Sequence, residues 1–362
     1  MPNYTNTRTL LGDQGALDAL VSDTLTILAD DTVAALRSYA LYNRKQLQEV
    51  YLPKVRTFPS SGFTGCSALK KIYLCQDSDP FTRPYTTLNA DALPGHAVLY
   101  VSDAQVSAWR AESRYSGFKD RIFGVSDDGK YEWDDSEIAD SWDTILANVQ
   151  NGTAATAYHL GQYKRLDLFT LGIIEFQIIG INADDLASGS GKAQLTWFPR
   201  LALPSASHRM NPQLSGTTPG TGTIGGMAYC EGQTWLDETV FPMIPDAVRA
   251  AIKSVRKYTT GYDTSGTLTA DMVTNHKLFL PSAREVGAAL YHANKETMGP
   301  VYSLAFANSD TNKRRNVNGA NVVNYSLRTA GSQNSFLIMN SSGSFTTLVS
   351  QSQGALAFGF CT

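Results

Sequence analysis

The feature that most restricts how this sequence can fold is an internal repeat with an offset of 22 residues. Residues 41–52 (LYNRKQLQEVYL) align with residues 63–74 (FTGCSALKKIYL). The matched pairs are Leu47 with Leu69, Val50 with Ile72, Tyr51 with Tyr73 and Leu52 with Leu74. A period of roughly 20 to 29 residues predicts stacked turns that each contribute one short strand. Two turns bury too little core alone, so we expect neighbouring segments to cap them.

The segments around the repeat carry patterns of their own. Apolar residues at helical spacing in residues 14–36 predict an N-terminal helix. Residues 98–101 are predicted to form a strand, followed by a helix that carries Val106 and Trp109. Residues 126–136 are acidic and polar, as in a linker, and residues 138–149 predict a short helix. We therefore expect an N-terminal helical segment (1–29), a repeat module with its cap (30–128), a linker (129–150) and a second domain (151–362).

The second domain is predicted to have an α+β fold. Residues 166–181 and 195–203 are strand-like, and residues 235–243 and 246–258 predict two helices. A short strand at 278–280 precedes the capping-box pattern of Ser282 and Glu285, which opens a helix to about Glu296. Short strands and polar loops fill the remainder. Because the helices are segregated from the strands, this order favours α+β over a sheet wound by βαβ units.

The C-terminal run, residues 306–362, has an unusual composition. From Asn316 to the end of the chain, Arg328 is the only charged residue. The other residues are mainly Asn, Ser, Thr, Gln and Gly, interrupted by short apolar pieces. Small neutral polar residues mixed with a few bulky ones can form an adaptable binding surface. The same residues also form ordinary turns, so a β-meander with polar loops is the alternative.

Two resemblances sharpen these expectations. Residues 60–74 (SSGFTGCSALKKIYL) resemble the BspA-like leucine-rich repeats of bacterial and phage surface proteins, over residues 30–76. Four later pieces occur together: residues 225–255, 277–286 (KLFLPSAREV), 325–330 (YSLRTA) and 354–362 (GALAFGFCT). They resemble an uncharacterised domain family of gut-bacterial prophages, over residues 155–362. That family is similar to the C-type-lectin or formylglycine-generating-enzyme fold, so the resemblance implies such a domain after the repeats.

The resemblance also implies a diversified ligand-binding face. Related phage tail proteins carry a C-terminal region that is rewritten by diversity-generating retroelements. The family's paired tryptophans before Leu-Arg-Ser are replaced here by Asn324, Tyr325 and Ser326. Such a change is tolerated on a variable loop. Adenine-targeted mutagenesis of Asn codons would produce the mixture of residues found between Asn316 and Gln351.

The candidate ligand-binding residues alternate with predicted core positions in residues 316–351. They are Asn316, Asn318, Asn321, Asn324, Tyr325, Ser326, Ser332, Asn334, Ser335, Phe336, Ile338, Asn340, Ser344, Thr346, Thr347, Val349 and Gln351. Leu327, Ala355, Phe358 and Phe360 are predicted to be core residues. Arg328 is predicted to hold the loops through hydrogen bonds.

Several function classes find no support in the sequence. The net charge of −3 gives no case for nucleic-acid binding. The longest apolar run is too short and too polar to insert in a membrane, and the N-terminus lacks a signal-peptide core. The five histidines and four cysteines lack paired metal-ligand spacing, so we expect no metal and no cofactor. Unpaired cysteines fit synthesis in a reducing cytoplasm.

These observations favour a binding protein over an enzyme. We expect a phage tail-tip adhesin that recognises a host cell-surface protein or glycan and acts on the virion or a bacterial surface. A homo-oligomer, with a trimer favoured, and contacts with other tail proteins would raise avidity. The first alternative is a structural tail protein without receptor binding, and the second is a formylglycine-generating-type enzyme. Neither a clustered acid nor a recognisable thiol motif supports the enzyme.

Overall fold

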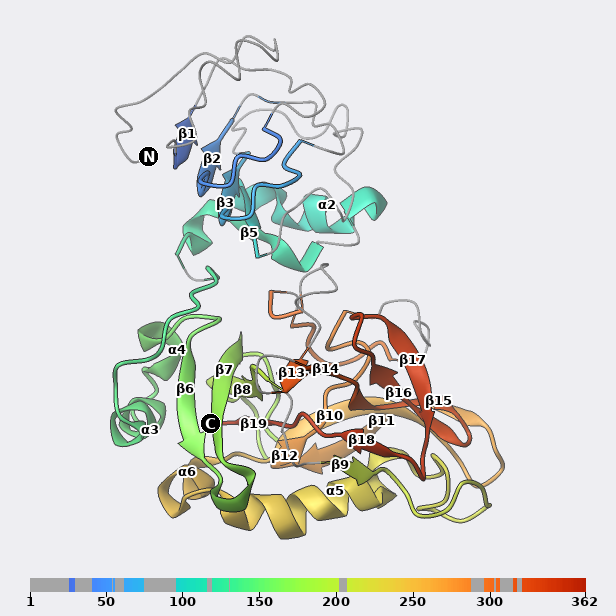
Figure 1. Ribbon diagram of the computed structural model, residues 1–362. Helices are drawn as coiled ribbons and strands as arrows, with labels where there is room; N and C mark the ends of the chain where they lie inside the picture. The colour runs from blue at the N-terminus through green and yellow to red at the C-terminus, as the bar shows by residue number, and fades with distance from the viewer. Residues whose placement is uncertain are drawn as a thin grey trace. The chain divides into compact units, whose positions relative to one another are not determined.

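The computed structural model divides the chain into two compact units, Met1–Trp133 and Asp134–Thr362 (Figure 1). The residues that the structure describes are 26–29, 41–53, 55, 62–74, 96–115, 119–129, 131–201, 207–287, 296–302, 304–306, 315–317 and 321–362. The boundary lies at residue 134, inside the acidic stretch of residues 126–136, whereas the second domain was expected to start only after the helix predicted at residues 138–149. The two units are described separately below.

The described part of the first unit forms a five-stranded parallel sheet with the strands in sequence order. Its strands are β1 (Ile27–Ala29), β2 (Glu49–Tyr51), β3 (Lys71–Tyr73), β4 (Val98–Val101) and β5 (Ile122–Gly124), and its α-helix is α2 (Val106–Ala111). The predicted strand at 98–101 and the helix after it are confirmed. A parallel sheet needs a crossover between each pair of strands, which the long repeat period supplies.

The 22-residue offset of the sequence repeat is the register of the first three strands of this sheet. Val50 pairs with Ile72 on one side and with Leu28 on the other. The repeat therefore extends one turn upstream, and residues 27–29 form β1 where the sequence predicted a helix. Apolar residues three apart fit both a helix face and the repeat pattern, so periodicity could not separate the two. The rest of the predicted helix lies outside the described residues.

The turns of the repeat also match at the same offset. Asn43 and Gly65 both have left-handed backbone angles, with φ of 58° and 82°. The Arg44 N–H donates to the Leu41 carbonyl, and the Cys66 N–H donates to the Phe63 carbonyl in the equivalent position. The same backbone turn thus forms twice, 22 residues apart. Glycine adopts this conformation without cost, and asparagine is among the residues that tolerate it best.

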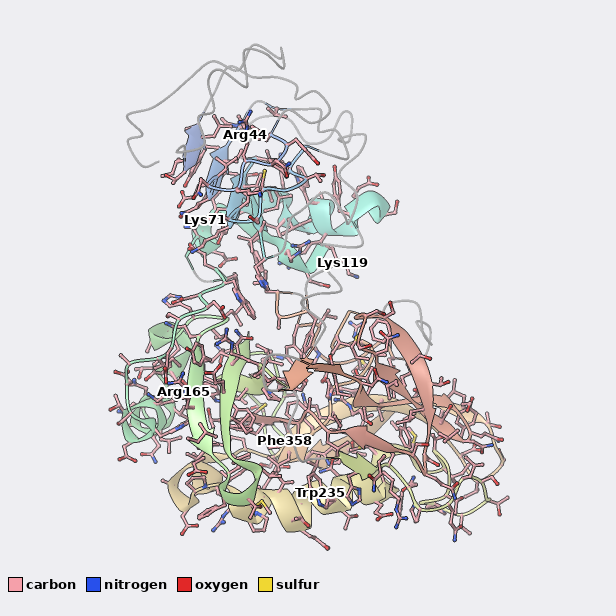
Figure 2. All side chains as sticks on the ribbon, in the orientation of Figure 1. Arg44, Lys71, Lys119, Arg165, Trp235 and Phe358 are labelled. Atoms are coloured by element: carbon pink, nitrogen blue, oxygen red, sulfur yellow. The ribbon has the colours of Figure 1, made fainter. Side chains whose placement is uncertain are left out.

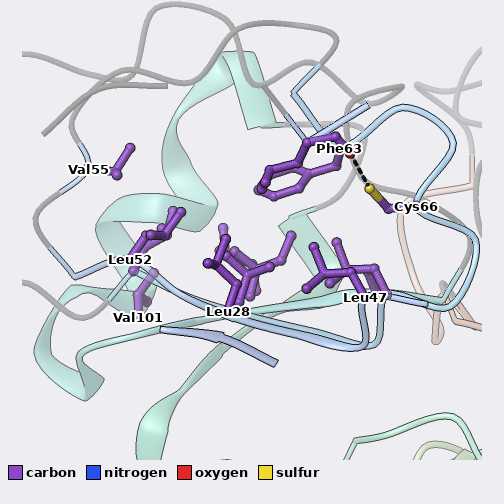
Figure 3. Close-up of a cluster of buried hydrophobic side chains, with 14 of the residues drawn as sticks. Leu28, Leu47, Leu52, Val55, Phe63, Cys66 and Val101 are labelled. Atoms are coloured by element: carbon purple, nitrogen blue, oxygen red, sulfur yellow. Dashed lines mark hydrogen bonds between the residues drawn. The ribbon is translucent and has the colours of Figure 1, made fainter. Parts of the chain in front are cut away.

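The two faces of the parallel sheet bury different side chains. One face packs Leu28, Val50 and Ile72 into the hydrophobic core drawn in Figure 3. The Cys66 thiol closes the edge of that core by donating to the Leu41 carbonyl at 2.8 Å. Three tyrosine rings cover the other face. Tyr73 stacks between Tyr51 and Tyr100, at ring-centroid distances of 4.0 and 4.9 Å. Both faces are therefore occupied within this unit, as parallel sheets require.

The second unit combines helices with several separate sheets (Figure 1). The first sheet has the order β12 (Leu278–Phe279), β19 (Gly359–Cys361), β8 (Leu195–Pro199), β7 (Ile173–Ile181) and β6 (Tyr163–Asp167). The second has the order β17 (Phe345–Val349), β16 (Ser335–Met339), β15 (Tyr325–Ser332), β18 (Gln353–Ala355) and β9 (Ser207–Arg209). Two antiparallel pairs complete the described strands: β10 (Val255–Tyr262) with β11 (Leu268–His276), and β13 (Arg315–Val317) with β14 (Asn321–Val323).

The α-helices in the described part of the second unit lie outside these sheets. They are α3 (Trp142–Gln150), α4 (Ala154–Ala157), α5 (Glu231–Trp235) and α6 (Asp246–Ala251). A π-helical turn over Leu236–Val240 and a 3-10 turn over Phe241–Met243 continue α5. Figure 2 shows Trp235 of α5 at the lower side of this unit and Phe358 near its centre. Phe358 packs against Phe176, with ring centroids 5.6 Å apart.

The end of the chain closes the first sheet of this unit. Strand β19 lies between β12 and β8, where Phe360 pairs with both Leu278 and Trp197. The Thr362 N–H donates to the Leu195 carbonyl, and the Leu195 N–H donates back to Thr362. The C-terminal residues are therefore central to the core of this unit.

Three sequence predictions need correction here. The expected linker 129–150 contains α3, which buries Ile145 and Val149 because it packs as part of the second unit. The single strand predicted for residues 166–181 is the hairpin of β6 and β7, with a turn that ends at Gly172 (φ 80°). The helix predicted for residues 246–258 ends at Ala251, because Val255 starts β10 and pairs with His276.

The repeated turn of the first unit yields a stability prediction. A Cβ atom at position 65 would lie 2.1 Å from the Asn43 Oδ1 atom. Gly65→Ala should therefore lower the free energy of unfolding by at least about 1–2 kcal/mol, the usual cost of a left-handed alanine. Asn43→Gly, the matched control, should remain close to the parent protein. Urea unfolding followed by circular dichroism measures both, and an unchanged Gly65→Ala variant would contradict the turn geometry.

Candidate functional site

The exposed residues of the C-terminal run gather along strand β17. This strand lies at the end of the second sheet, and within the described residues it pairs with β16 alone. Thr346, Thr347 and Val349 expose their side chains, with 45% of the Val349 surface accessible. A strand at the end of a sheet can add a further strand or an extended ligand along its backbone.

The turns at both ends of β17 extend this surface. Nine of the predicted residues lie on β17 and in the adjoining turns. Eight of them are exposed and Asn340 is half-buried, and we call this set the β17 band. Its members are Asn324, Ser332, Asn334, Asn340, Ser344, Thr346, Thr347, Val349 and Gln351. The structure thus brings about half of the predicted site residues onto one strand and its adjoining turns. Whether they bind a ligand stays a prediction.

The turn before β17 is fixed by asparagine side chains. The Asn340 Oδ1 atom accepts hydrogen bonds from the backbone N–H groups of Ser342 at 2.9 Å and Ser344 at 3.0 Å. The Asn324 Oδ1 atom accepts from the Ser341 N–H at 2.9 Å. Asparagine commonly replaces a backbone acceptor in turns in this way. These bonds join the start of β15 to the turn between β16 and β17.

The opposite end of the band is anchored on two other loops. Gln351 donates its side-chain amide to the Pro212 carbonyl at 3.0 Å, and Gln333 donates to the Gly266 carbonyl at 3.1 Å. The Gln333 carbonyl accepts from the Thr223 N–H at 2.8 Å. At Gly222 (φ 54°) a Cβ atom would lie 2.2 Å from that same carbonyl, so the close approach requires glycine. Residues from 212 to 223 thereby support the turn that carries Asn334.

Five predicted contact residues are buried and need correction. They are Tyr325, Ser326, Ser335, Phe336 and Ile338, with exposures from 0 to 6%. They lie on β15 and β16, the inner strands of the sheet, which are covered on both faces. The Tyr325 ring, for example, packs 6.5 Å from the Phe198 ring. These side chains cannot contact a ligand on the surface of this structure.

The remaining predictions in this run have mixed outcomes. Leu327, Phe358 and Phe360 are fully buried, as predicted for core residues, whereas Ala355 is half-buried. The backbone of Asn316 lies on β13 and that of Asn321 on β14. Their side chains, and all of Asn318, lie outside what the structure describes.

A buried cluster of charged side chains lies in the core of this unit, and we call it the core ion cluster. It consists of Asp184, Lys257, Glu285 and Arg328, each at most 1% exposed. Lys257 on β10 donates to Asp184 Oδ1 at 2.6 Å and to Glu285 Oε1 at 3.0 Å. Arg328 on β15 contacts Glu285 Oε2 at 2.7 Å. Two acids and two bases thus face one another without access to water.

Further hydrogen bonds satisfy the same charged groups. Tyr302 and Thr196 donate their hydroxyl groups to the Asp184 carboxylate. Arg328 also donates to the Tyr258 carbonyl and to the Leu280 carbonyl. The prediction that Arg328 is a structural hydrogen-bonder is therefore confirmed. Buried charges are tolerated only when they are paired and fully hydrogen-bonded, as here.

The environment of the core ion cluster shifts its pKa values. Burial opposes ionisation of Asp184 and Glu285, but the nearby positive charges outweigh burial and lower both pKa values. Lys257 acts on both acids, while Arg328 acts most strongly on Glu285. Burial likewise opposes the charge of Arg328, and Glu285 raises its pKa. Asp184, Glu285 and Arg328 are therefore held in their charged forms by their partners.

Sequence reasoning missed most of this cluster. Adjacent acidic residues such as Asp184 and Asp185 usually lie in solvent, but only Asp185 reaches the surface, where it pairs with Lys192 at 2.9 Å. The capping-box prediction did locate Glu285: its carboxylate accepts from the Ser282 N–H at 3.0 Å, and the Ser282 hydroxyl accepts from the Glu285 N–H at 3.2 Å. The helix expected beyond it extends into residues outside the described part of the chain.

The burial of Lys257 could have been predicted from the sequence. Along β10 the side chains alternate, with Val255, Lys257 and Thr259 buried. Strand alternation would have placed this lysine inward if the segment had been recognised as a strand. The helical reading of residues 246–258 concealed it.

The band and the cluster have different chemical capacities. The β17 band contains no ionisable side chain, so it offers hydrogen bonds and apolar contacts rather than acid–base catalysis. Among the described residues, no set of three His, Cys, Asp or Glu side chains is arranged to hold a metal ion. Cys66, Cys230 and Cys361 are buried and free. In the described chain, no helix combines the length and apolarity required to cross a bilayer.

The core ion cluster predicts a large effect of removing one partner. Arg328→Met should lower the free energy of unfolding by about 3–5 kcal/mol, because Glu285 loses one of its two positively charged partners inside the core. Arg165→Met is the matched control, since Arg165 forms ion pairs at the surface with half of its side chain exposed. Its stability should stay near that of the parent protein. Urea unfolding compares the two, and equal losses would contradict a special role for the cluster.

The buried side chain of His276 should make the stability of the protein depend on pH. Burial, with the charges of Arg328 and Lys257, lowers its pKa from 6.5 to about 3, and its ring contacts Thr274. The unfolded chain therefore binds a proton that the folded chain rejects. The free energy of unfolding should fall as the pH is lowered from 6.5 toward 3. Asp184 and Glu285 add to this loss only at the lower end, near their ordinary pKa values.

Between pH 7 and 5, the effect of His276 on stability can be measured apart from that of the carboxylates. His276→Gln should flatten the dependence of the urea midpoint on pH in this range. His159→Gln is the matched control, because His159 is exposed in the folded protein and should leave the profile unchanged. A His276→Gln profile that is as steep as the parent profile would rule out this source.

Comparisons with known proteins cover part of the second unit. Residues 225–355 match the model of a family described as a domain of unknown function, DUF6273. The match includes the whole β17 band, together with Lys257, Glu285 and Arg328, but it ends short of Asp184 on the N-terminal side. No curated protein and no solved structure matches the chain. The second unit therefore contains a region similar to DUF6273, a description that names no activity.

Proposed function

We propose that the protein is a receptor- or ligand-binding protein, of the phage tail-tip adhesin type, whose β17 band recognises a host cell surface. The observation that carries the proposal is the collection of an uncharged, exposed set of residues on one edge strand. From Asn316 onward the only charged side chain, Arg328, is buried, so the band is entirely neutral. Hydrogen-bonding side chains of several kinds on a fixed backbone are suited to the recognition of a ligand.

The frame beneath the band supports this proposal. Arg328 on β15 is tied to the core ion cluster, and β15 and β16 are buried between β17 and the interior. Substitutions of exposed side chains on β17 would leave those contacts in place. Rigid support is what a binding surface needs, because a ligand then does not have to order the site.

We assign the second unit to a C-type-lectin-like fold and the first unit to a short leucine-rich repeat module. The pairing of the C-terminal strand β19 with the early strand β8 supports the first assignment, since it closes the ends of the domain in one sheet. The parallel register at an offset of 22 residues supports the second. In this reading the repeat module is a spacer.

The neutrality of the β17 band favours a neutral glycan or an uncharged polypeptide as ligand. Hydrogen bonds from Asn, Ser, Thr and Gln side chains would orient the ligand, and Val349 would supply an apolar contact. Affinity should then depend weakly on salt, in contrast to charge-driven binding. Several copies in a symmetric assembly, with a trimer favoured, would raise avidity.

A substitution on the band tests the proposal. The double variant Thr346→Arg and Thr347→Glu should reduce binding of the purified protein to host bacterial cells at least tenfold, because its bulky charges would disrupt a neutral contact surface. Flow cytometry with the labelled protein measures binding. The urea midpoint should stay near that of the parent protein, since both side chains are exposed.

A matched control uses exposed residues of another strand. Ala270→Arg with Asn275→Glu adds the same charges to β11 and should preserve binding. Equal binding by the parent protein and the β17 variant would contradict the proposal.

The edge position of β17 also favours a second candidate, a structural tail protein in which the band packs on a neighbouring subunit. A strand at the end of a sheet is a common place for a strand from another copy to pair. In that case the β17 variant would change the assembly state while leaving cell binding unaffected. Light scattering with the same two variants distinguishes the candidates.

A further inference from the structure

Lys257, Asp184 and Glu285 are held in contact inside the core, an arrangement that allows a chemical reaction as well as ion pairing. The Lys257 Nζ atom lies 2.6 Å from Asp184 Oδ1 and 3.0 Å from Glu285 Oε1, with all three side chains at most 1% exposed. The same nitrogen lies 3.4 Å from the centroid of the Phe279 ring. An amine, a carboxyl group and a second carboxylate are thus held in contact in a space closed to bulk water.

We propose that Lys257 and Asp184 react to form an intramolecular amide, an isopeptide bond between Lys257 Nζ and Asp184 Cγ, with Glu285 as the proton carrier. The inference rests on this core geometry alone and does not depend on the proposed binding function. No cofactor or oxidant is needed, because the reaction is a condensation that releases one water molecule.

The proton transfers balance within the three side chains. The Lys257 ammonium first passes a proton to the Asp184 carboxylate, giving a neutral amine and a neutral acid. The nitrogen lone pair then forms a bond to Asp184 Cγ, and Glu285 accepts a proton from the nitrogen. Glu285 returns that proton to the departing Asp184 oxygen, which leaves as water. The products are a neutral amide, one water and Glu285 in its original ionised form.

The surroundings favour each of these steps. Lys257 and Asp184 are in contact at 2.6 Å, so one proton transfer along this hydrogen bond converts the ion pair to the neutral amine and acid without leaving an unpaired charge in the core. Because the amine and the carboxyl group are held in contact, their effective concentration is very high. The condensation therefore does not need the chemical activation of the acid that it would need in solution.

Neighbouring hydroxyl groups are placed to stabilise the intermediate. Tyr302 donates to Asp184 Oδ1 at 2.9 Å and to Oδ2 at 2.7 Å, and Thr196 also donates to Oδ2. When the nitrogen attacks, negative charge develops on these oxygens, and fixed donors lower its energy. Arg328 keeps Glu285 ionised through its contact at 2.7 Å, so that Glu285 is ready to accept a proton.

The bond would connect distant parts of the second unit. Asp184 follows β7 and Lys257 lies on β10, 73 residues later. The amide would therefore close a long loop and restrict the unfolded chain, in the same way as a disulfide. It would do so without cysteine chemistry, and thus in either redox environment.

Intact-mass spectrometry of the full-length denatured protein tests the inference directly. The parent protein should be lighter than its sequence mass by one water, and a protease digest should contain one branched peptide that joins Asp184 to Lys257. Lys257→Met should show its full sequence mass. Asp184→Asn should give the same branched product as the parent, because the amide side chain would release ammonia in place of water.

Two controls locate the chemistry. Asp185 and Lys192 form a surface pair with a similar contact of 2.9 Å, and their peptides should remain unlinked. Glu285→Gln should lower the linked fraction, since glutamine cannot carry the proton. A parent protein at its full sequence mass, with no branched peptide, would overturn the inference irrespective of how the variants fold.

Discussion

The second unit depends on a charge-balanced cluster that is sealed from water. Lys257 joins Asp184 and Glu285, and Arg328 holds Glu285 from the other side. These residues come from four separate parts of the chain, so the cluster can form only when the core has assembled. An ion pair of this kind adds little net stability over apolar packing, but a missing partner is costly. A core that assembles with one of these partners out of place would therefore be strongly destabilised.

The position of the β17 band follows from that core. Strand β15 carries Arg328 inward, β16 covers it, and β17 is left as the edge with its side chains in solvent. Two constraints fix the ends of the band: the Asn340 turn on one side and the bonds of Gln333 and Gln351 on the other. The backbone is thus determined by buried polar contacts, while the exposed side chains make few demands on the fold. This separation is the physical basis for proposing a variable recognition surface.

The first unit is built on a different principle. Its stability comes from the repetition of one turn, in which Leu28, Val50 and Ile72 stack along the core and Tyr51, Tyr73 and Tyr100 stack on the opposite face. Each turn contacts mainly its neighbours, so the module needs no long-range polar cluster. Its regularity is also why the sequence revealed it: identical environments select similar residues at a fixed spacing.

Several features could be predicted from the sequence: the repeat register, the capping box at Ser282 and Glu285, the burial of Leu327 and Phe360, and the structural role of Arg328. These features depend on local spacing or on a strong apolar or charge preference. Long-range packing was needed to show that Tyr325 and Phe336 are buried while Thr346 and Thr347 are exposed. Alternation gives two faces to a strand, but whether one or both are covered depends on neighbours from elsewhere in the chain. The pairing of Asp184 with Lys257 was equally hidden, because contact between residues 73 positions apart is a property of the folded core and leaves no local pattern.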